Sequence, residues 1–263
     1  DIIIGTLLPA GSVSILYYAD RVNQLPLGVI ATAAGTALLP AVTRNIALGE
    51  EGEANTALNR AFESVLMLTL PAAIGLSVAA KAVMDVAFVR GAFSVHDAVL
   101  AGRSLAAFAL GLPVFALIKI FTPGFYARGD TVTPLKIGIF AVLLNLGLNL
   151  LFMHPLKAVG PALATSLSSA CNALLLFWLL RQRGHFSFDA LSRRRIPRIL
   201  LAGVVMAAAL WGVQRLLPQS VASLPYFLLL VLVGALFYFG PGLALKAFDL
   251  AAFLGLLRRR KRG

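Results

Sequence analysis

The chain has 263 residues, of which 59% are hydrophobic and 13% are charged. Soluble domains are about half apolar and about one quarter charged, so this composition excludes an ordinary soluble fold and indicates a membrane protein. The net charge of +12 would suggest nucleic-acid binding in a soluble protein. Here eleven of the 23 Lys and Arg residues lie beside apolar segments, at 181–198 and 258–262, as in cytoplasmic membrane flanks. We therefore expect membrane lipids, and no nucleic acid, as partners.

Apolar runs recur along the whole chain, and a bilayer core requires about 20 apolar residues in a helix. A first piece at 1–10 opens with Asp1 and three isoleucines rather than with Met, and we expect a longer protein upstream. Seven spans follow, at 12–46, 57–80, 98–126, 134–153, 158–180, 196–217 and 224–247. The sequence therefore predicts an all-α integral membrane protein, a polytopic helix bundle.

Two segments differ from a simple series of membrane-spanning helices. The span 12–46 is long for one crossing, and Pro26 inside it predicts a kink or a break. Residues 50–62 carry polar side chains and predict a short surface helix between two spans.

The basic residues predict the orientation. The loops alternate along the chain, and one set of them holds sixteen Lys and Arg residues whereas the opposite set holds four. Cytoplasmic loops carry the excess of positive charge in membrane proteins. The C-terminus is therefore expected on the cytoplasmic side of a bacterial inner membrane.

A charged pair, Asp20 and Arg21, lies inside the first full span. If the helix begins near Ser12, Arg21 lies about 13 Å into the span at about 1.5 Å per residue. An arginine near the centre of a membrane costs about 2.5–3.5 kcal/mol, so it is expected to face a watery cavity or a partner. The alternative is that Arg21 pairs with Asp20 or extends to the interface. Gln24 lies on nearly the same face and is expected to line the same cavity.

Two asparagines, Asn145 and Asn149, are spaced by four residues and share a helix face. On the next span a stripe of polar residues runs through Thr165, Ser169 and Asn172. These side chains suit hydrogen bonding between helices, or a site for a hard cation such as sodium, whose ligands are oxygens. Asp1 would add a carboxylate to the site if its helix packs alongside.

The segment PGFYARGDTVTPLK, residues 123–136, predicts a helix end, a tight cytoplasmic turn and a new helix. Thr133 can cap the new helix and Pro134 suits its first position. Arg128 and Asp130 would then lie at the cytoplasmic mouth, either as a gate or as ordinary turn residues.

Catalytic motifs are not found. The three histidines lie scattered on predicted loops, there is no phosphate-binding glycine loop, and Cys171 is the single cysteine, so we expect no enzyme and no organic cofactor. A membrane glycosyltransferase would need an acidic group at the outer face, where only Asp85 and Asp97 lie. A scaffold protein would not explain the charged pair within a span.

Three strings resemble the MurJ/MviN family of lipid II flippases in the MOP superfamily: GSVSILYYADRVNQLPLGV (11–29), GTALLPAVTR (35–44) and PGFYARGDTVTPLK (123–136). The resemblance runs in order to about residue 180 and more loosely to 250. It implies a carrier of lipid II, the peptidoglycan precursor, that works by alternating access coupled to a cation or to the membrane potential. Another MOP carrier, such as an O-antigen-type flippase or a drug antiporter, is the alternative.

The resemblance also implies domains and site residues. Residues 1–190 would form the C-terminal lobe, 191–250 an extra helix pair with a groove for the lipid tail, and 251–263 a basic cytoplasmic tail, while the N-terminal lobe is missing. Arg21 corresponds to a cavity arginine and Asp20 to its neighbour. The family's sodium site would correspond to Asp1, Asn145, Asn149, the Pro161 carbonyl and Thr165. The family can have an acid where Asn149 stands, so this site carries less negative charge.

Overall fold

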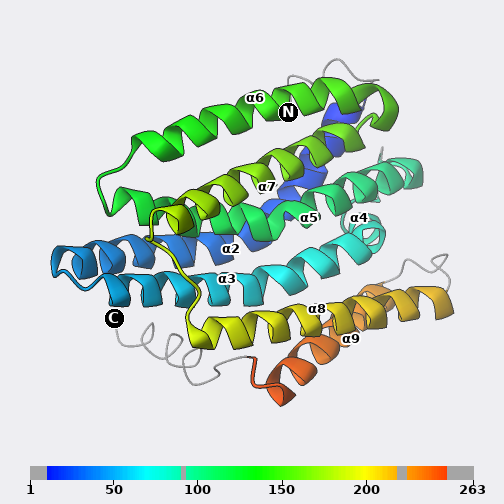
Figure 1. Cartoon of the computed structure of the whole chain (residues 1–263). Coiled ribbons are helices and arrows are strands. Elements are labelled where there is room, and N and C mark those ends of the chain that lie inside the picture. The colour runs from blue at the N-terminus through cyan, green and yellow to red at the C-terminus, as the bar shows by residue number, and fades with distance from the viewer. Residues whose placement is uncertain (1–10, 90–92, 218–223, 248–263) are drawn as a thin grey trace, which may run out of the picture.

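The computed structural model describes residues 11–89, 93–217 and 224–247, apart from the side chains of 29–37, and these residues form α-helices joined by short connections (Figure 1). The helices are α2 (Ser12–Ala47), α3 (Glu51–Val78), α4 (Ala80–Phe88), α5 (Val95–Tyr126), α6 (Val132–Leu156), α7 (Val159–Gln182), α8 (Ala190–Leu216) and α9 (Leu224–Ala244). The all-α bundle predicted from the sequence is confirmed.

Six of these helices, α3 and α5 to α9, are long and apolar enough to cross a membrane. They coincide with six of the seven predicted spans, and α2 occupies the remaining one, at 12–46. Their boundaries differ from the predicted ones by a few residues, because the helices continue into polar turns that hydropathy alone does not include.

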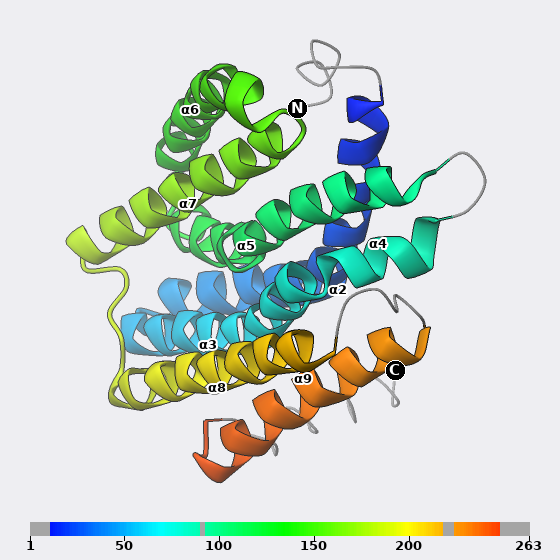
Figure 2. The ribbon, with the colours of Figure 1, turned by 90° about the vertical axis from the view of Figure 1, so that its right-hand side faces the viewer.

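The sequence predicted a kink or a break of α2 at Pro26. α2 continues through Pro26 and Pro40 without a break, and the views show that it changes direction along its length, as a kink would produce (Figure 1, Figure 2). One prediction about a helix end was wrong. Residues 50–62 do not form a separate surface helix, because α3 runs unbroken from Glu51 to Val78. No proline or glycine pair interrupts its first turns, and the acidic residues Glu51 and Glu53 there favour a helix N-terminus.

α5 is the central helix, and α2, α3 and α7 all pack against it. Small residues allow the close approach: a Cβ added at Gly111 would lie 2.6 Å from the Ser166 hydroxyl of α7. That hydroxyl donates a hydrogen bond of 2.7 Å to the Ala107 carbonyl of α5. α6 packs mainly on α7 and leaves much of its apolar surface exposed.

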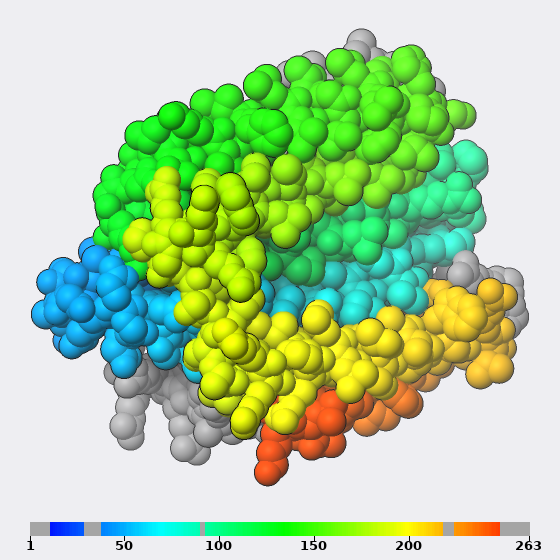
Figure 3. Space-filling view, in the orientation of Figure 1, coloured from blue at the N-terminus to red at the C-terminus, as the bar shows by residue number. Residues whose placement is uncertain are grey.

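α8 and α9 lie together along α3, on the side of the bundle away from α6 (Figure 2). Hydrogen bonds to backbone carbonyls of α3 help to hold the pair there: Tyr238 donates to the Met67 carbonyl at 2.7 Å and Gln214 donates to the Val78 carbonyl at 2.6 Å. The space-filling view shows α6 and α8 at opposite edges of one face, with α7, α5 and α3 between them (Figure 3).

Candidate functional site

The polar residues of α2 form two pairs, each spaced by one helical turn. The Gln24 amide donates a hydrogen bond to the Asp20 carboxylate. The Arg21 guanidinium lies over the Tyr17 ring, 4.9 Å from its centroid, and both side chains are exposed. Neighbouring residues of a helix point about 100° apart, and Arg21 correspondingly pairs with Tyr17 rather than with Asp20.

A cavity of about 240 Å³ lies beside these pairs, between α2, α5 and α7. Asp20, Gln24 and Thr165 line it, whereas Arg21 does not. The cavity is completed by Leu16, Tyr17, Asn23, Leu27, Phe108 and Phe115. The structure therefore places the predicted substrate residues Asp20 and Gln24 next to Thr165, which the sequence assigned to an ion site.

Asn23 is the residue that sequence reasoning missed in this region. Its side chain is 2% exposed, and its Oδ1 atom has no hydrogen-bond partner among the residues that the structure describes. Its spacing of three residues from Asp20 was a usable signal, because residues i and i+3 share a helix face.

The predicted ion-site residues of α6 and α7 come together. The Asn145 amide donates to the Thr165 hydroxyl at 3.3 Å, and the Thr165 hydroxyl donates to the Pro161 carbonyl at 2.9 Å. The Asn149 amide donates to the Asn145 side-chain oxygen at 2.9 Å, and Asn149 is fully buried. These contacts form one polar cluster across the helix pair.

Two details of this cluster differ from the sequence prediction. Ser168, rather than Ser169, accepts a hydrogen bond from the Asn145 amide, at 3.3 Å. Asp1, the predicted carboxylate of the site, lies outside the described residues. The contacts described within the cluster are hydrogen bonds between neutral groups, which suit interhelical packing and also leave oxygen atoms of the kind that bind hard cations.

Arg128 and Asp130 lie at the connection between α5 and α6, as expected. Arg128 donates to the Gly124 carbonyl at 2.8 Å and pairs with the Glu51 carboxylate of α3. Asp130 pairs with Arg183 at the end of α7. Both residues are therefore held by partners within this part of the protein.

The cap of α6 is not the one predicted. The backbone N–H of Thr133 donates to the Asp130 carboxylate at 2.9 Å, so Asp130 and not Thr133 provides the capping oxygen. The hydrogen bonds from Thr133, together with the one from Arg183, lower the pKa of Asp130 to about 2. Pro134 consequently lies in the first turn but is not its first residue, since the helix begins at Val132.

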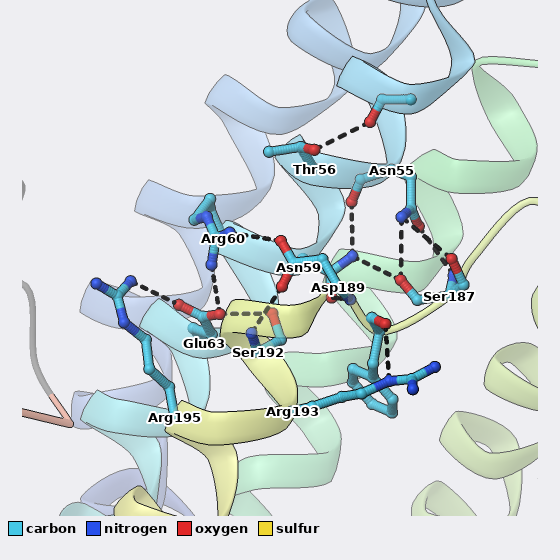
Figure 4. A network of polar contacts seen from close by, with 12 residues as sticks. Asn55, Thr56, Asn59, Arg60, Glu63, Ser187, Asp189, Ser192, Arg193 and Arg195 are labelled. Carbon is cyan, nitrogen blue, oxygen red and sulfur yellow. Dashed lines mark hydrogen bonds and ion pairs between the residues drawn. The ribbon is translucent and has the colours of Figure 1, made fainter.

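A second polar network, which the sequence did not reveal, joins the N-terminal half of α3 to the start of α8 (Figure 4). The Glu63 carboxylate pairs with Arg60 of its own helix and with Arg195 of α8, and it accepts a hydrogen bond from the Ser192 hydroxyl. Arg60 also pairs with Asp189, which caps α8 by accepting from the Ser192 N–H. The network fixes the start of α8 to α3.

The pKa of Asp189, a member of this network, is set by opposing effects of burial and of hydrogen bonding. Burial alone would raise the pKa of its carboxyl, but the hydrogen bonds from Ser192 and the nearby Arg60 outweigh it and lower the pKa. Close by, Asn55 and Asn59 of α3 donate to the Ser187 carbonyl at 3.0 and 2.8 Å, which holds the connection between α7 and α8 against α3 (Figure 4).

The bundle of membrane-length helices, with small residues at the helix contacts and polar clusters between helices, defines a polytopic α-helical membrane protein. A multidrug resistance MATE family transporter of the MOP superfamily, in an inward-facing conformation, has the same fold with a TM-score of 0.52 at 19% identity, over 89% of this chain and 55% of that one. A solved structure described as "Lipid II flippase MurJ, inward closed conformation" superposes with a TM-score of 0.77 at 25% identity, over 91% of this chain and 48% of that one.

The sequence model described as "Lipid II flippase MurJ" matches residues 1–232. A probable lipid II flippase MurJ from Rhizobium meliloti is 46% identical over 201 residues, which cover 76% of this chain and 38% of that protein. One from Vibrio cholerae is 36% identical over 254 residues, covering 89% of this chain and 48% of that protein. The chain belongs to the MurJ family of lipid II flippases, and it spans less than half the length of these relatives.

Proposed function

We propose that this chain is the C-terminal part of a carrier that moves lipid II from the cytoplasmic to the periplasmic face of the inner membrane, without covalent chemistry. Support comes from the family match over residues 1–232. The observation that carries the proposal is Arg21: an exposed guanidinium on a predominantly apolar helix, forming no ion pair with any carboxylate among the described residues.

Arg21 suits a lipid-linked diphosphate because the guanidinium is planar and forms forked hydrogen bonds to phosphate oxygens. A single arginine provides too little positive charge to hold a diphosphate headgroup. The partner lobe, at the N-terminal side of the whole protein, would supply further donors in alternating access. We therefore expect the 263-residue chain alone not to transport.

Ion coupling is part of the same proposal. The cluster of Asn145, Asn149, Thr165 and the Pro161 carbonyl offers neutral oxygens to a sodium ion, with Asp1 as the expected carboxylate. Neutral ligands bind a monovalent cation weakly, so its occupancy would respond to ionic conditions and to the membrane potential.

The membrane arrangement completes the proposal. Residues 1–190 would form the C-terminal lobe and 191–250 the helix pair that accommodates the lipid tail, with 251–263 in the cytoplasm. Exposed apolar side chains on α8 and α9, such as Val204 and Leu232, support a lipid-facing surface for the pair.

The test is growth of cells that depend on the full gene product after depletion of the native flippase. Arg21→Ala is expected to abolish growth at a normal membrane level of the protein, measured by blot. Arg103→Ala is the matched control, because this exposed arginine lies near the outer end of α5 and is expected to be dispensable. Normal growth with Arg21→Ala would contradict the assignment of Arg21 to the headgroup.

A further inference from the structure

The guanidinium of Arg21 is supported by an aromatic ring. Its Cζ atom lies over the Tyr17 ring, 4.9 Å from the ring centroid, one helical turn toward the start of α2. A cation is attracted to the face of an aromatic ring by the quadrupole of the ring, and this contact uses none of the N–H donors of the guanidinium. Among the residues that the structure describes, no ion pair with a carboxylate occupies those donors.

The carboxylate next to Arg21 in the sequence has a different partner. Asp20 accepts a hydrogen bond from the Gln24 amide, and both residues line the cavity between α2, α5 and α7. Tyr17 also lines this cavity, whereas Arg21 does not. The Tyr17 ring therefore holds the guanidinium outside the cavity and away from the Asp20 carboxylate.

The turn of α2 that carries Tyr17 is fixed to the bundle on both sides of this residue. Tyr18 packs on Phe88 at the end of α4, with ring centroids 4.8 Å apart, and on Phe93 before α5, at 5.5 Å. Leu16 is 4% exposed. The Tyr17 ring also contacts the Tyr18 ring edge-on, at 5.9 Å. The ring of Tyr17 consequently has a fixed place, although the residue itself is 45% exposed.

A fixed ring beneath an arginine favours the binding of a phosphate. An arginine side chain has many rotamers, and ordering them when a ligand binds lowers the affinity. A guanidinium that already lies over a ring loses less freedom on binding. Its N–H groups remain available for forked hydrogen bonds to phosphate oxygens.

We infer that Tyr17 is a positioning residue, which holds Arg21 in place for the diphosphate of a lipid-linked substrate; this role rests on the proposed function of Arg21. Tyr17 acts through the arginine and need not touch the substrate. The cation lies over the ring, so the ring and not the hydroxyl carries the effect. Phe or Trp can therefore replace Tyr17, whereas an aliphatic residue cannot.

Binding of lipid II to the purified full gene product in detergent tests this role. Arg21→Ala is expected to weaken the affinity by about tenfold or more, and Tyr17→Leu by about three- to tenfold. Tyr17→Phe and Tyr17→Trp keep a ring and are expected to stay within about twofold of the unaltered protein. Tyr126→Leu is the matched control, because Tyr126 at the end of α5 has the same exposed fraction, 45%, and its loss is expected to leave the affinity unchanged.

Two further measurements separate positioning from a general structural effect. In the Arg21→Ala background, Tyr17→Leu is expected to cause no additional loss, because the ring then has no guanidinium to hold. A polyprenol with the same tail but no diphosphate is the second probe. Tyr17→Leu is expected to leave its binding unchanged, and the thermal midpoint of each variant shows whether the protein remains folded.

The role of Tyr17 would be overturned by equal losses in Tyr17→Phe and Tyr17→Leu, by additive losses in the double variant, or by weaker polyprenol binding in Tyr17→Leu. It would also be overturned if Tyr17→Leu bound lipid II normally. In that case a loss of affinity in Arg21→Ala would leave the proposed function of Arg21 intact. Normal binding by Arg21→Ala would overturn both, so the two failures are distinguishable.

Discussion

At the scale of single residues, the direction of a side chain decides its role more than its type does. Asp20, Arg21 and Asn23 lie within one turn of α2, yet Arg21 is exposed over Tyr17 while the other two line the cavity. One helix thus presents a positive group in one direction and acceptors in another. A sequence shows that the three residues are close together, but it does not show which neighbours each one meets.

Asp130 permits a test of pH dependence. Its pKa is lowered to about 2 by the hydrogen bonds of Thr133 and by Arg183, so the ionised form is favoured in the folded state. Its contribution to stability is therefore complete above about pH 4 and is lost as the pH falls toward 2. Asp130→Ala is expected to lower the free energy of unfolding by about 1 kcal/mol at pH 7, the usual value of a helix cap.

The measurement is the unfolding midpoint of the purified protein at pH 7 and at pH 3. Asp130→Asn retains an oxygen for the Thr133 N–H and is expected to lose less than Asp130→Ala. Equal losses in the two variants would show that the charge, and not the cap, makes the contribution.

At the scale of the helices, hydropathy predicted the spans well because the apolar length needed to cross a membrane does not depend on neighbouring helices. The ends were predicted less well. The N-terminal half of α3 and the first turns of α8 are polar, and their charged residues Glu63, Arg60, Asp189 and Arg195 pair with one another across the two helices (Figure 4). Their positions lie far apart in the sequence, which gives no local signal of the pairing.

Glu63 is the centre of that network and its replacement tests the attachment of α8. Glu63→Ala leaves Arg60 and Arg195 without their shared carboxylate, whose side chain is 8% exposed. The expected loss is about 2 kcal/mol, between the values for exposed and buried ion pairs, or a midpoint lower by about 4–8 °C.

Glu53→Ala is the matched control, because Glu53 is an exposed acid on the same helix and its loss is expected to cost less than about 0.5 kcal/mol. A double-mutant cycle of Glu63→Ala with Arg195→Ala measures the coupling directly. If the effects of the two substitutions on the free energy of unfolding are additive, Glu63 and Arg195 do not stabilise the contact between α3 and α8 through their ion pair.

At the scale of the whole molecule, the helix order and the family resemblance were both accessible from the sequence, and the fold confirms them. The cavity was not, because it is formed by side chains from α2, α5 and α7 that no periodicity brings together. The polar cluster of α6 and α7 was predicted in most of its members, since each helix carries its polar residues at helical spacing. Ser168 was missed because spacing by three and by four residues are both compatible with one face.

The proposed orientation is tested by reporter fusions to the full gene product. Fusions after positions 186 and 263 are expected to place a reporter in the cytoplasm, and a fusion after position 92 is expected to place it in the periplasm, because the basic loops remain inside. A fluorescent protein reports the first location and alkaline phosphatase the second. Phosphatase activity after position 263 would contradict the cytoplasmic C-terminus.

The contacts of Asn55 and Asn59 with Ser187 have a consequence for chain continuity. The connection between α7 and α8 is bound to α3, and α8 is bound there independently by Arg195 and Gln214. The covalent link across Gly184 is therefore not what holds the last two helices in place. A protein cleaved at that glycine would migrate as one particle until denatured, and the gene could be divided there into two separately expressed pieces.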